Sequence, residues 1–341
     1  MNFELSQRQR ELLLKTLEIY ISTGTPVGSH ALSDEVDASS STIRAELAYL
    51  ESLGLLDHPH TSAGRVPTDA GYRYYVDRVL ERLEPRPAGF ALDLSGAQTE
   101  VDEALRATTD ALSQVTRLLA LVSAPPLETT IVKHVEVLLL QPQLVMVVVI
   151  TSTGGVTKRV FAFSDPVDPG LAEWAREFLN ERVAGLQLGA RLLRARFEDP
   201  ELSPRERAFL GEIAPAFTEL VEAGDRSLYV GGTAGLLDEF QADDLRGYRR
   251  LLEVLEERAE LLELVRANLV SKDPFVRVGS EFGDPELRTI SLVAAPYGLR
   301  HRNLGTVSLL GPMRMDYVKA IGAVRSAAHE LSLFVEELYE D

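Results

Sequence analysis

Apolar side chains in residues 40–53 recur at helical spacing, and polar side chains fill the positions between them. Ile43, Leu47 and Leu50 fall at i, i+4 and i+7, which places them on one side of a helix and predicts that this side is buried. Gly54 follows where helices commonly end in the left-handed conformation. Short hydroxyl side chains, which cap free backbone N–H groups, crowd the helix start: Ser39, Ser40, Ser41 and Thr42. The pattern predicts a helix with one packed side and one side free to bind.

Two further helices are predicted upstream. Ser6 and Gln9 have the spacing of a capping box and precede an amphipathic segment. A turn over residues 23–28 follows, and we expect Ser29 to cap a short helix that reaches Val36. A two-residue connection then leads to the helix described above. This order is that of a helix-turn-helix, whose second helix enters the major groove of DNA.

A short apolar strand and a polar loop follow the third helix. Leu55 and Leu56 predict the strand, residues 58–65 form a compact loop, and a further helix is predicted over residues 69–83. The alternative is a small helical bundle with an incidental polar loop. Four boundary signals in the right order favour a winged helix instead, and we assign residues 1–84 to a winged-helix DNA-binding domain.

The predicted DNA contacts form three groups. Those at the start of the recognition helix are Ser39, Ser40, Ser41, Thr42 and Arg44. Those on the wing, expected along the backbone or in the minor groove, are His58, His60, Thr61, Ser62 and Arg65. Those in the helix after the wing are Tyr72 and Arg73. Arg44 is the strongest candidate for a base contact, because a guanidinium group pairs with guanine through two hydrogen bonds, whereas hydroxyl groups more often bind phosphates.

The rest of the chain alternates strand-rich and helix-rich blocks. A linker over residues 85–94 contains two prolines and a glycine, and a helix is expected from residue 95 or 99 to about Val122. The expected strands cover residues 132–140, 144–150, 156–163, 275–278, 289–296 and 305–310, and the last helix covers residues 316–338.

Strands at both ends of this region, with helices between them, indicate one α+β domain that is interrupted by an insertion. We assign residues 95–163 and 227–341 to the domain and residues 164–226, which are rich in helical pattern, to the insertion. The predicted fold class is therefore multidomain α/β (α+β), with the winged helix-turn-helix at the N-terminus.

Four segments of the sequence carry a resemblance to a known family. They are LSQRQRELLLKTLEIYISTGTPVGSHALS, SSSTIRAELAYLESLGLL, HPHTSAGRVPTDAGYRYYVD and LGTVSLLGPMRMDY. On these segments the chain resembles the HrcA family, heat-inducible repressors of bacterial chaperone operons. The resemblance implies a homodimer that binds the inverted-repeat operator called CIRCE, released on heat stress, with activity modulated by the GroEL chaperonin. It also implies that the α+β domain is GAF-like and that the insertion is an inserted dimerisation domain.

The net charge opposes DNA as a partner. The chain has a formal charge of −17, and residues 1–84 contain eight Arg or Lys against thirteen Asp or Glu, whereas DNA-binding proteins usually present a basic surface. The distribution of charge reduces the conflict, because the wing from His58 to Pro67 contains Arg65 and no acid. We therefore expect few phosphate contacts, a modest dependence of affinity on salt, and binding that is sensitive to the protonation of His58 and His60.

Several classes of function are not indicated. The chain has no cysteine, which excludes disulfides, thiol catalysis and cysteine-ligated zinc, and its six histidines form no helical metal-binding pair. A G-x-S-x-G nucleophile motif is also missing, so we expect no enzyme, no metal and no cofactor. The longest apolar run, Leu144–Ile150, is too short to cross a bilayer, and a charged helix rather than a signal opens the chain. We expect a cytoplasmic protein without a membrane partner.

A second function stays open, namely a ligand-gated regulator whose GAF-like domain senses a small molecule. The glycine-rich segment over residues 230–235 is the candidate site, since backbone N–H groups of a glycine loop can hold an anion. It lacks the Lys and the Ser/Thr of a phosphate-binding loop, and a tight turn between strand and helix is the favoured interpretation.

Overall fold

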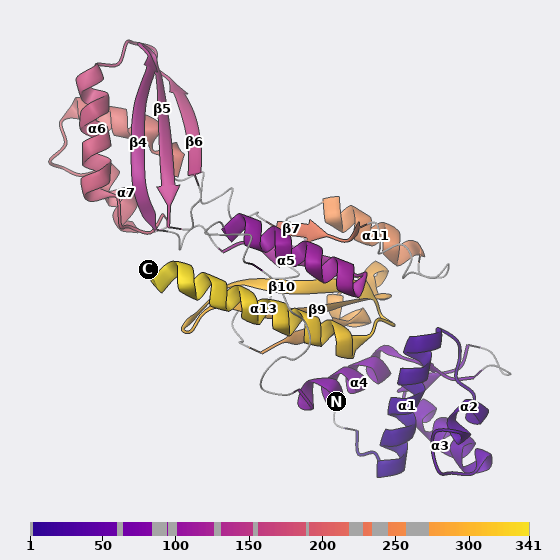
Figure 1. Cartoon of the computed structure of the whole chain (residues 1–341). Helices are drawn as coiled ribbons and strands as arrows, with labels where there is room; N and C mark the ends of the chain where they lie inside the picture. The colour runs from indigo at the N-terminus through magenta and orange to yellow at the C-terminus, as the bar shows by residue number, and fades with distance from the viewer. Residues whose placement is uncertain are drawn as a thin grey trace.

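The structure is a computed structural model that describes residues 3–59, 64–83, 94, 101–125, 131–152, 156–188, 191–217, 228–233, 245–256 and 273–340. Figure 1 shows three parts: a helical N-terminal domain, a central sheet with helices on it, and a separate unit of sheet and helices. Within the described residues, no helix is long and apolar enough to cross a membrane.

The N-terminal domain is a winged helix, as predicted. Its elements are α1 (Gln7–Thr23), α2 (Ser29–Ser33), α3 (Ser40–Ser52), β1 (Leu56–Asp57), β2 (Val66–Pro67) and α4 (Asp69–Glu81). The capping box forms, since the Ser6 side chain accepts the Gln9 N–H and the Gln9 side chain accepts the Ser6 N–H. Strands β1 and β2 pair antiparallel at the base of the wing. The short helix α2 differs in detail, because Gly28 rather than Ser29 is its N-cap and it ends at Ser33.

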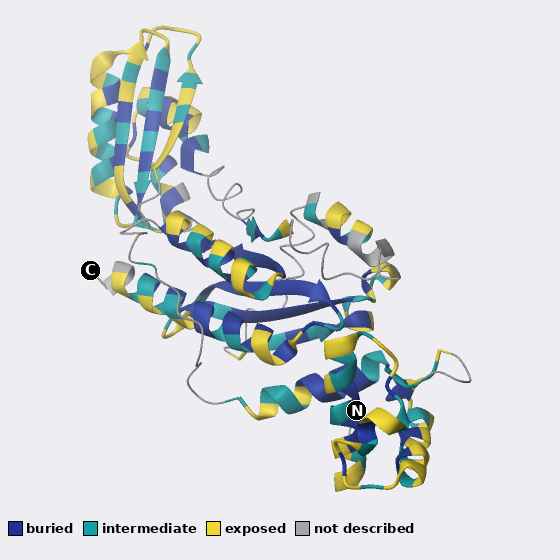
Figure 2. Cartoon of the chain, turned by 45° about the vertical axis from the view of Figure 1, so that its right-hand side comes forward, coloured by how far each residue is buried: buried dark blue, intermediate teal, exposed yellow. Residues whose placement is uncertain are grey.

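The central domain is built on a five-stranded antiparallel sheet in the order β7-β3-β10-β9-β8. Its elements are α5 (Val101–Thr116), β3 (Leu119–Ser123), β7 (Leu228–Gly231), α11 (Leu245–Glu256), β8 (Phe275–Val278), η4 (Gly279–Phe282), η5 (Pro285–Leu287), β9 (Ile290–Leu299), β10 (Arg302–Pro312) and α13 (Tyr317–Glu340). Helices α5 and α13 lie side by side on one face of the sheet, and Figure 2 shows that the middle strands are buried along their length. The strands and the helix predicted near the C-terminus are present.

The helix that we expected to reach Val122 ends at Thr116 instead. Arg117 takes a left-handed conformation with φ of 60°, and Leu119–Ser123 then forms a strand between β7 and β10. All five residues of this strand are buried. A strand that is covered on both faces shows no alternation of apolar and polar residues, so its sequence resembles a continuation of the helix before it.

The glycine-rich segment begins at the end of β7, and its described part supports the tight-turn interpretation. Gly232 has φ of +86°, and a Cβ added there would lie 2.5 Å from the Leu118 carbonyl oxygen and 2.6 Å from the Ser113 Cβ. Glycine is therefore required for close packing against the end of α5. The rest of the segment, from residue 234, lies outside the described residues.

The third part has a sheet and a hydrophobic core of its own. Its elements are β4 (Val132–Gln141), β5 (Leu144–Thr151), β6 (Val156–Ala162), α6 (Pro169–Arg182), α7 (Arg191–Phe197) and α8 (Pro204–Ile213). The three strands pair antiparallel in the order β4-β5-β6 and do not join the central sheet. Their inward side chains pack against the helices in a core that extends from Val132 to Phe217.

The expected start of the insertion at residue 164 is therefore wrong. We assigned the strands over residues 132–163 to the interrupted domain, but they belong to the inserted unit because α6 and α8 cover their buried face. The strand and helix patterns alone did not show which helices cover which sheet. The expected linker over residues 85–94 lies outside the described residues, apart from residue 94.

Candidate nucleic-acid interface

The recognition helix α3 buries one side and exposes the start of the other. Ile43 and Leu50 are fully buried and Leu47 nearly so, as the spacing predicted, whereas Ser40 and Arg44 are exposed. An exposed helix start beside a wing is the part of such a domain that can reach base edges in a major groove.

Hydroxyl groups fix the start of α3. The Ser39 side chain caps the helix by accepting the Thr42 N–H, and its oxygen lies 2.9 Å from the Ser41 hydroxyl and 2.8 Å from the Thr42 hydroxyl. Ser39 and Thr42 are therefore occupied in shaping the helix start. Their expected contacts with DNA, like those of Ser40 and Ser41, stay predictions.

Arg44 is held in place by the neighbouring helix. Its Nε donates a hydrogen bond of 3.2 Å to the Ser29 hydroxyl on α2, and the same hydroxyl lies 3.2 Å from that of Ser40. Because the partner of Arg44 is a hydroxyl group rather than a carboxylate, it orients the guanidinium group without neutralising its charge. The sequence does not reveal Ser29 as a support for Arg44, since the two are fifteen residues apart.

The base of the wing is tied to the turn before α2. Val27 and Arg65 form an antiparallel bridge with two backbone hydrogen bonds of 2.8 Å. Gly64 is pressed against this bridge, so an added Cβ would lie 2.5 Å from the Val27 carbonyl carbon. Three expected contacts of the wing, His60, Thr61 and Ser62, lie outside the described residues.

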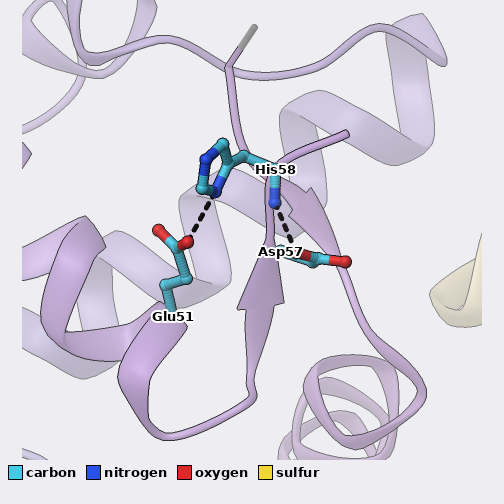
Figure 3. Close-up of side chains that lie close together, drawn as sticks. All are labelled: Glu51, Asp57 and His58. Atoms are coloured by element: carbon cyan, nitrogen blue, oxygen red, sulfur yellow. Dashed lines mark hydrogen bonds and ion pairs between the residues drawn. The ribbon is translucent and has the colours of Figure 1, made fainter. Parts of the chain in front are cut away.

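Glu51, in the last turn of α3, binds both of the remaining wing candidates. Its Oε1 lies 2.5 Å from Nδ1 of His58, and its Oε2 lies 2.8 Å from the Arg65 guanidinium nitrogen. Figure 3 shows the Glu51 carboxylate directed at the ring of His58. The His58 contact is a close approach without hydrogen-bond geometry, and it is an ion pair only if the imidazole is protonated. From the sequence, His58 and Arg65 are expected to be available to DNA. In the structure both side chains face a carboxylate, which no pattern in the sequence indicated.

The same corner brings together three groups that could ligate a metal ion. Among the described residues, ligand atoms of Glu51, Asp57 and His58 lie within 4.8 Å of one another. Oxygen and imidazole donors suit a zinc-like cation. The Arg65 guanidinium already neutralises Glu51, however, and one Asp57 oxygen accepts the backbone N–H of His58 at 2.8 Å, so we assign no metal to this corner.

The structure contradicts the two contacts expected after the wing. Tyr72 is 2% exposed and packs against Tyr317 of the central domain. Arg73 binds Glu281 at 3.1 Å and donates a hydrogen bond of 2.7 Å to the Val276 carbonyl oxygen. Both residues therefore join the N-terminal domain to the central domain. Aromatic and basic residues near a wing suggested a DNA contact because the sequence does not reveal a second domain on that face of α4.

Ion pairs occupy many of the basic side chains of this domain. The pairs are Lys15 with Glu18 and Glu35, Arg65 with Glu51, Arg73 with Asp77, and Arg78 with Glu81. The hydrogen bond to Glu18 raises the pKa of Lys15 and keeps it charged, but this charge is directed at acids. The domain therefore offers DNA a small number of cations, in line with its net negative charge.

Comparisons with known proteins agree with this geometry. A family model described as a winged helix-turn-helix transcription repressor, HrcA DNA-binding, matches residues 4–78, and one described as the HrcA protein C terminal domain matches residues 102–321. The heat-inducible transcription repressor HrcA of Thermobifida fusca (strain YX) is 38% identical over 336 residues, which cover 95% of each chain. The HrcA of Parafrankia sp. (strain EAN1pec) is 35% identical over 332 residues, covering 95% of this chain and 97% of its own.

One solved structure shares the whole fold. It is the crystal structure of a hypothetical protein, which superposes with a TM-score of 0.67 at 24% sequence identity and covers 98% of this chain and 100% of its own. This match supports the arrangement of the three parts described above.

Proposed function

Because the chain belongs to the HrcA family of heat-inducible transcription repressors, we propose that it represses chaperone operons by binding an inverted-repeat operator of the CIRCE type as a homodimer. Its DNA-binding part is the winged helix, and DNA is accordingly its partner. We place this activity in the cytoplasm, where such an operator lies.

The exposed start of α3 is the observation that carries the proposal. Arg44 is exposed on the recognition helix, and a hydroxyl group, that of Ser29, rather than a carboxylate orients its guanidinium group. Such a group can pair with guanine O6 and N7 in the major groove, while Ser40 and Ser41 can bind the adjacent phosphates. A homodimer presents two such helices to the two halves of an inverted repeat.

The open face of the inserted sheet supports the homodimer. Leu138, Met146 and Val160 lie side by side across β4, β5 and β6, on the face that α6 and α8 leave uncovered. Leu138 is 41% exposed and Val160 is 53% exposed. Contiguous apolar side chains on a surface mark a contact with another protein, and a second copy of the chain would cover them.

Release on heating follows from the way the domains share one core. The core of the winged helix continues into the central domain through α4, so we expect loosening of the central domain to release the winged helix from its fixed orientation. Marginal stability makes such loosening steep with temperature. We propose that the GroEL chaperonin restores the packed form and thereby supports repression.

The alternative is a regulator gated by a small molecule. A cavity of about 490 Å³ lies between α4 and η4, where a ligand could change the orientation of the winged helix. Its charged lining side chains already bind one another or the backbone, as Arg73 with Glu281 and Asp69 with the Ser280 N–H do. We therefore favour the chaperonin-linked repressor. A thermal-shift screen of metabolites separates the two, since a ligand of the folded state raises the melting temperature.

The direct test is a titration of the full-length protein with a labelled duplex that carries the inverted repeat, beside a scrambled duplex of the same composition, at fixed salt. We expect a preference for the repeat that Arg44→Ala abolishes, with half the repeat bound much more weakly than the whole. Equal affinity for the repeat and the scrambled duplex would rule out the proposed function.

A further inference from the structure

We propose that Glu51 is a positioning residue for the wing: it holds His58 and Arg65 against the end of the recognition helix, and these two residues act through that contact rather than by binding phosphate. The inference rests on the DNA-binding function proposed above. It assigns a role in specificity to an acidic residue in a protein whose partner is a polyanion.

The Glu51 carboxylate contacts both ends of the wing loop. His58 precedes the loop of the wing and Arg65 follows it, and each binds a different oxygen of Glu51, at 2.5 Å and 2.8 Å. One side chain on α3 therefore holds both ends of the same loop. Since Glu51 belongs to the last turn of α3, the position of the wing is set relative to the helix that reads the bases.

The Arg65 side chain is partly buried and does not extend toward the expected position of DNA. The side chains of Arg65 and Glu51 are 22% and 25% exposed, and the Arg65 Nε is shielded from solvent. Binding a phosphate would require the guanidinium group to leave Glu51 and move outward. The backbone of Arg65 opposes such a movement, because it is fixed by two hydrogen bonds to Val27.

The negative charge of Glu51 predicts that its removal changes general DNA affinity and sequence preference in opposite directions. Glu51 repels the DNA backbone, so a protein selected only for affinity would gain by losing it. Its replacement by glutamine removes this repulsion and releases Arg65, which raises general affinity for DNA. The same change loosens the wing and lowers the preference for the correct sequence. A residue that served only stability would not change these two quantities in opposite directions.

The test uses the full-length variants Glu51→Gln, Arg65→Ala and the double variant, titrated with the repeat and the scrambled duplex over a range of salt concentrations. For Glu51→Gln we expect the preference for the repeat to fall by about fivefold, the upper range for the loss of one partly exposed ion pair, that of Glu51 with Arg65. Affinity for the scrambled duplex should rise with a steeper dependence on salt. Arg65→Ala should lower the preference similarly without changing the salt dependence, and the double variant should show no further loss of preference.

Glu46→Gln is the matched control, because it removes the same charge from the same helix and its carboxylate binds Gln9 rather than the wing. It should leave the preference unchanged. The inference is overturned if Arg65→Ala weakens both duplexes equally and lowers the salt slope by about one, which would make Arg65 a phosphate contact. It is also overturned if the losses of preference in the single variants add in the double variant. If the unmodified protein shows no preference for the repeat, the proposed function fails instead, so the two failures are distinguishable.

Discussion

The rings of Tyr72 and Tyr317 lie with their centroids 6.2 Å apart, one in α4 of the winged helix and the other at the first residue of α13. Both side chains are at most 2% exposed. The Tyr317 hydroxyl donates a hydrogen bond of 2.6 Å to the Met313 carbonyl oxygen and lies 2.7 Å from the Ser291 hydroxyl. The pair therefore joins the DNA-binding domain to the central sheet through apolar contact that is anchored by buried hydrogen bonds.

Two truncations of Tyr317 should weaken this contact between the domains to different extents. Tyr317→Phe removes only the hydroxyl, so we expect a loss of about 1–2 kcal/mol in the free energy of unfolding from the unpaired groups left behind. Tyr317→Ala removes the ring and should cost about 3–5 kcal/mol. Urea denaturation measures both, and Tyr49→Phe, at an exposed position, is the control. A loss in Tyr317→Phe no larger than that in the control would show that the buried hydroxyl does not stabilise this contact.

High pH should loosen the same contact. Burial raises the pKa of Tyr75, whose ring lies 6.3 Å from that of Tyr317, from 10.0 to about 12. A raised pKa in the folded state means that folding favours the neutral phenol, so this stabilisation is complete below pH 10 and is lost as the pH rises toward 12. We expect the melting temperature to fall over this range, and to fall less in Tyr75→Phe. Parallel curves for the two proteins would exclude Tyr75 as a contributor.

The sequence predicted local features well where one short segment determines them. The caps at Ser6 and Ser39 form as expected, because the residues that cap a helix lie within three positions of one another. The apolar spacing of Ile43, Leu47 and Leu50 likewise identified the buried side of α3. These signals were enough to predict the winged helix.

Features that depend on distant partners were not predicted. The strand at Leu119–Ser123 could not be distinguished in the sequence from the helix before it. Segments far away in the chain cover both faces of the strand, so its residues do not alternate between apolar and polar. The sequence suggests Tyr72 and Arg73 as DNA contacts because their true partners, Tyr317 and Glu281, lie more than two hundred residues away. In the candidate site, the contact between Glu51 and Arg65 was missed because an acid near the end of a helix is usually solvated.

Replacing Arg44 by lysine should separate charge from geometry at the recognition helix. Lysine keeps the positive charge but lacks the rigid, planar pair of N–H donors that matches guanine, and it has no Nε–H with which to bind Ser29. We expect affinity for the repeat to fall by about 1–3 kcal/mol, while affinity for a scrambled duplex is unchanged. Ser29→Ala should show a smaller loss of the same kind. Anisotropy titrations with both duplexes measure this, and an equal loss for both would assign Arg44 to phosphate contact.

A charge on the open face of the inserted sheet should separate the proposed homodimer into monomers. Val160→Lys places an ammonium group beside Met146, among the apolar side chains that the proposed partner copy would cover, and the burial of a charge there is costly. Light scattering should show a monomer at concentrations at which the unmodified protein is dimeric, with a melting temperature close to that of Val318→Lys. Val318 is a suitable control because it is 58% exposed on α13, away from this sheet. The monomer should bind half of the repeat with the same affinity as the unmodified protein. Unlike the unmodified protein, it should not bind the whole repeat more tightly than the half. A dimer that persists in Val160→Lys would show that another surface joins the two copies.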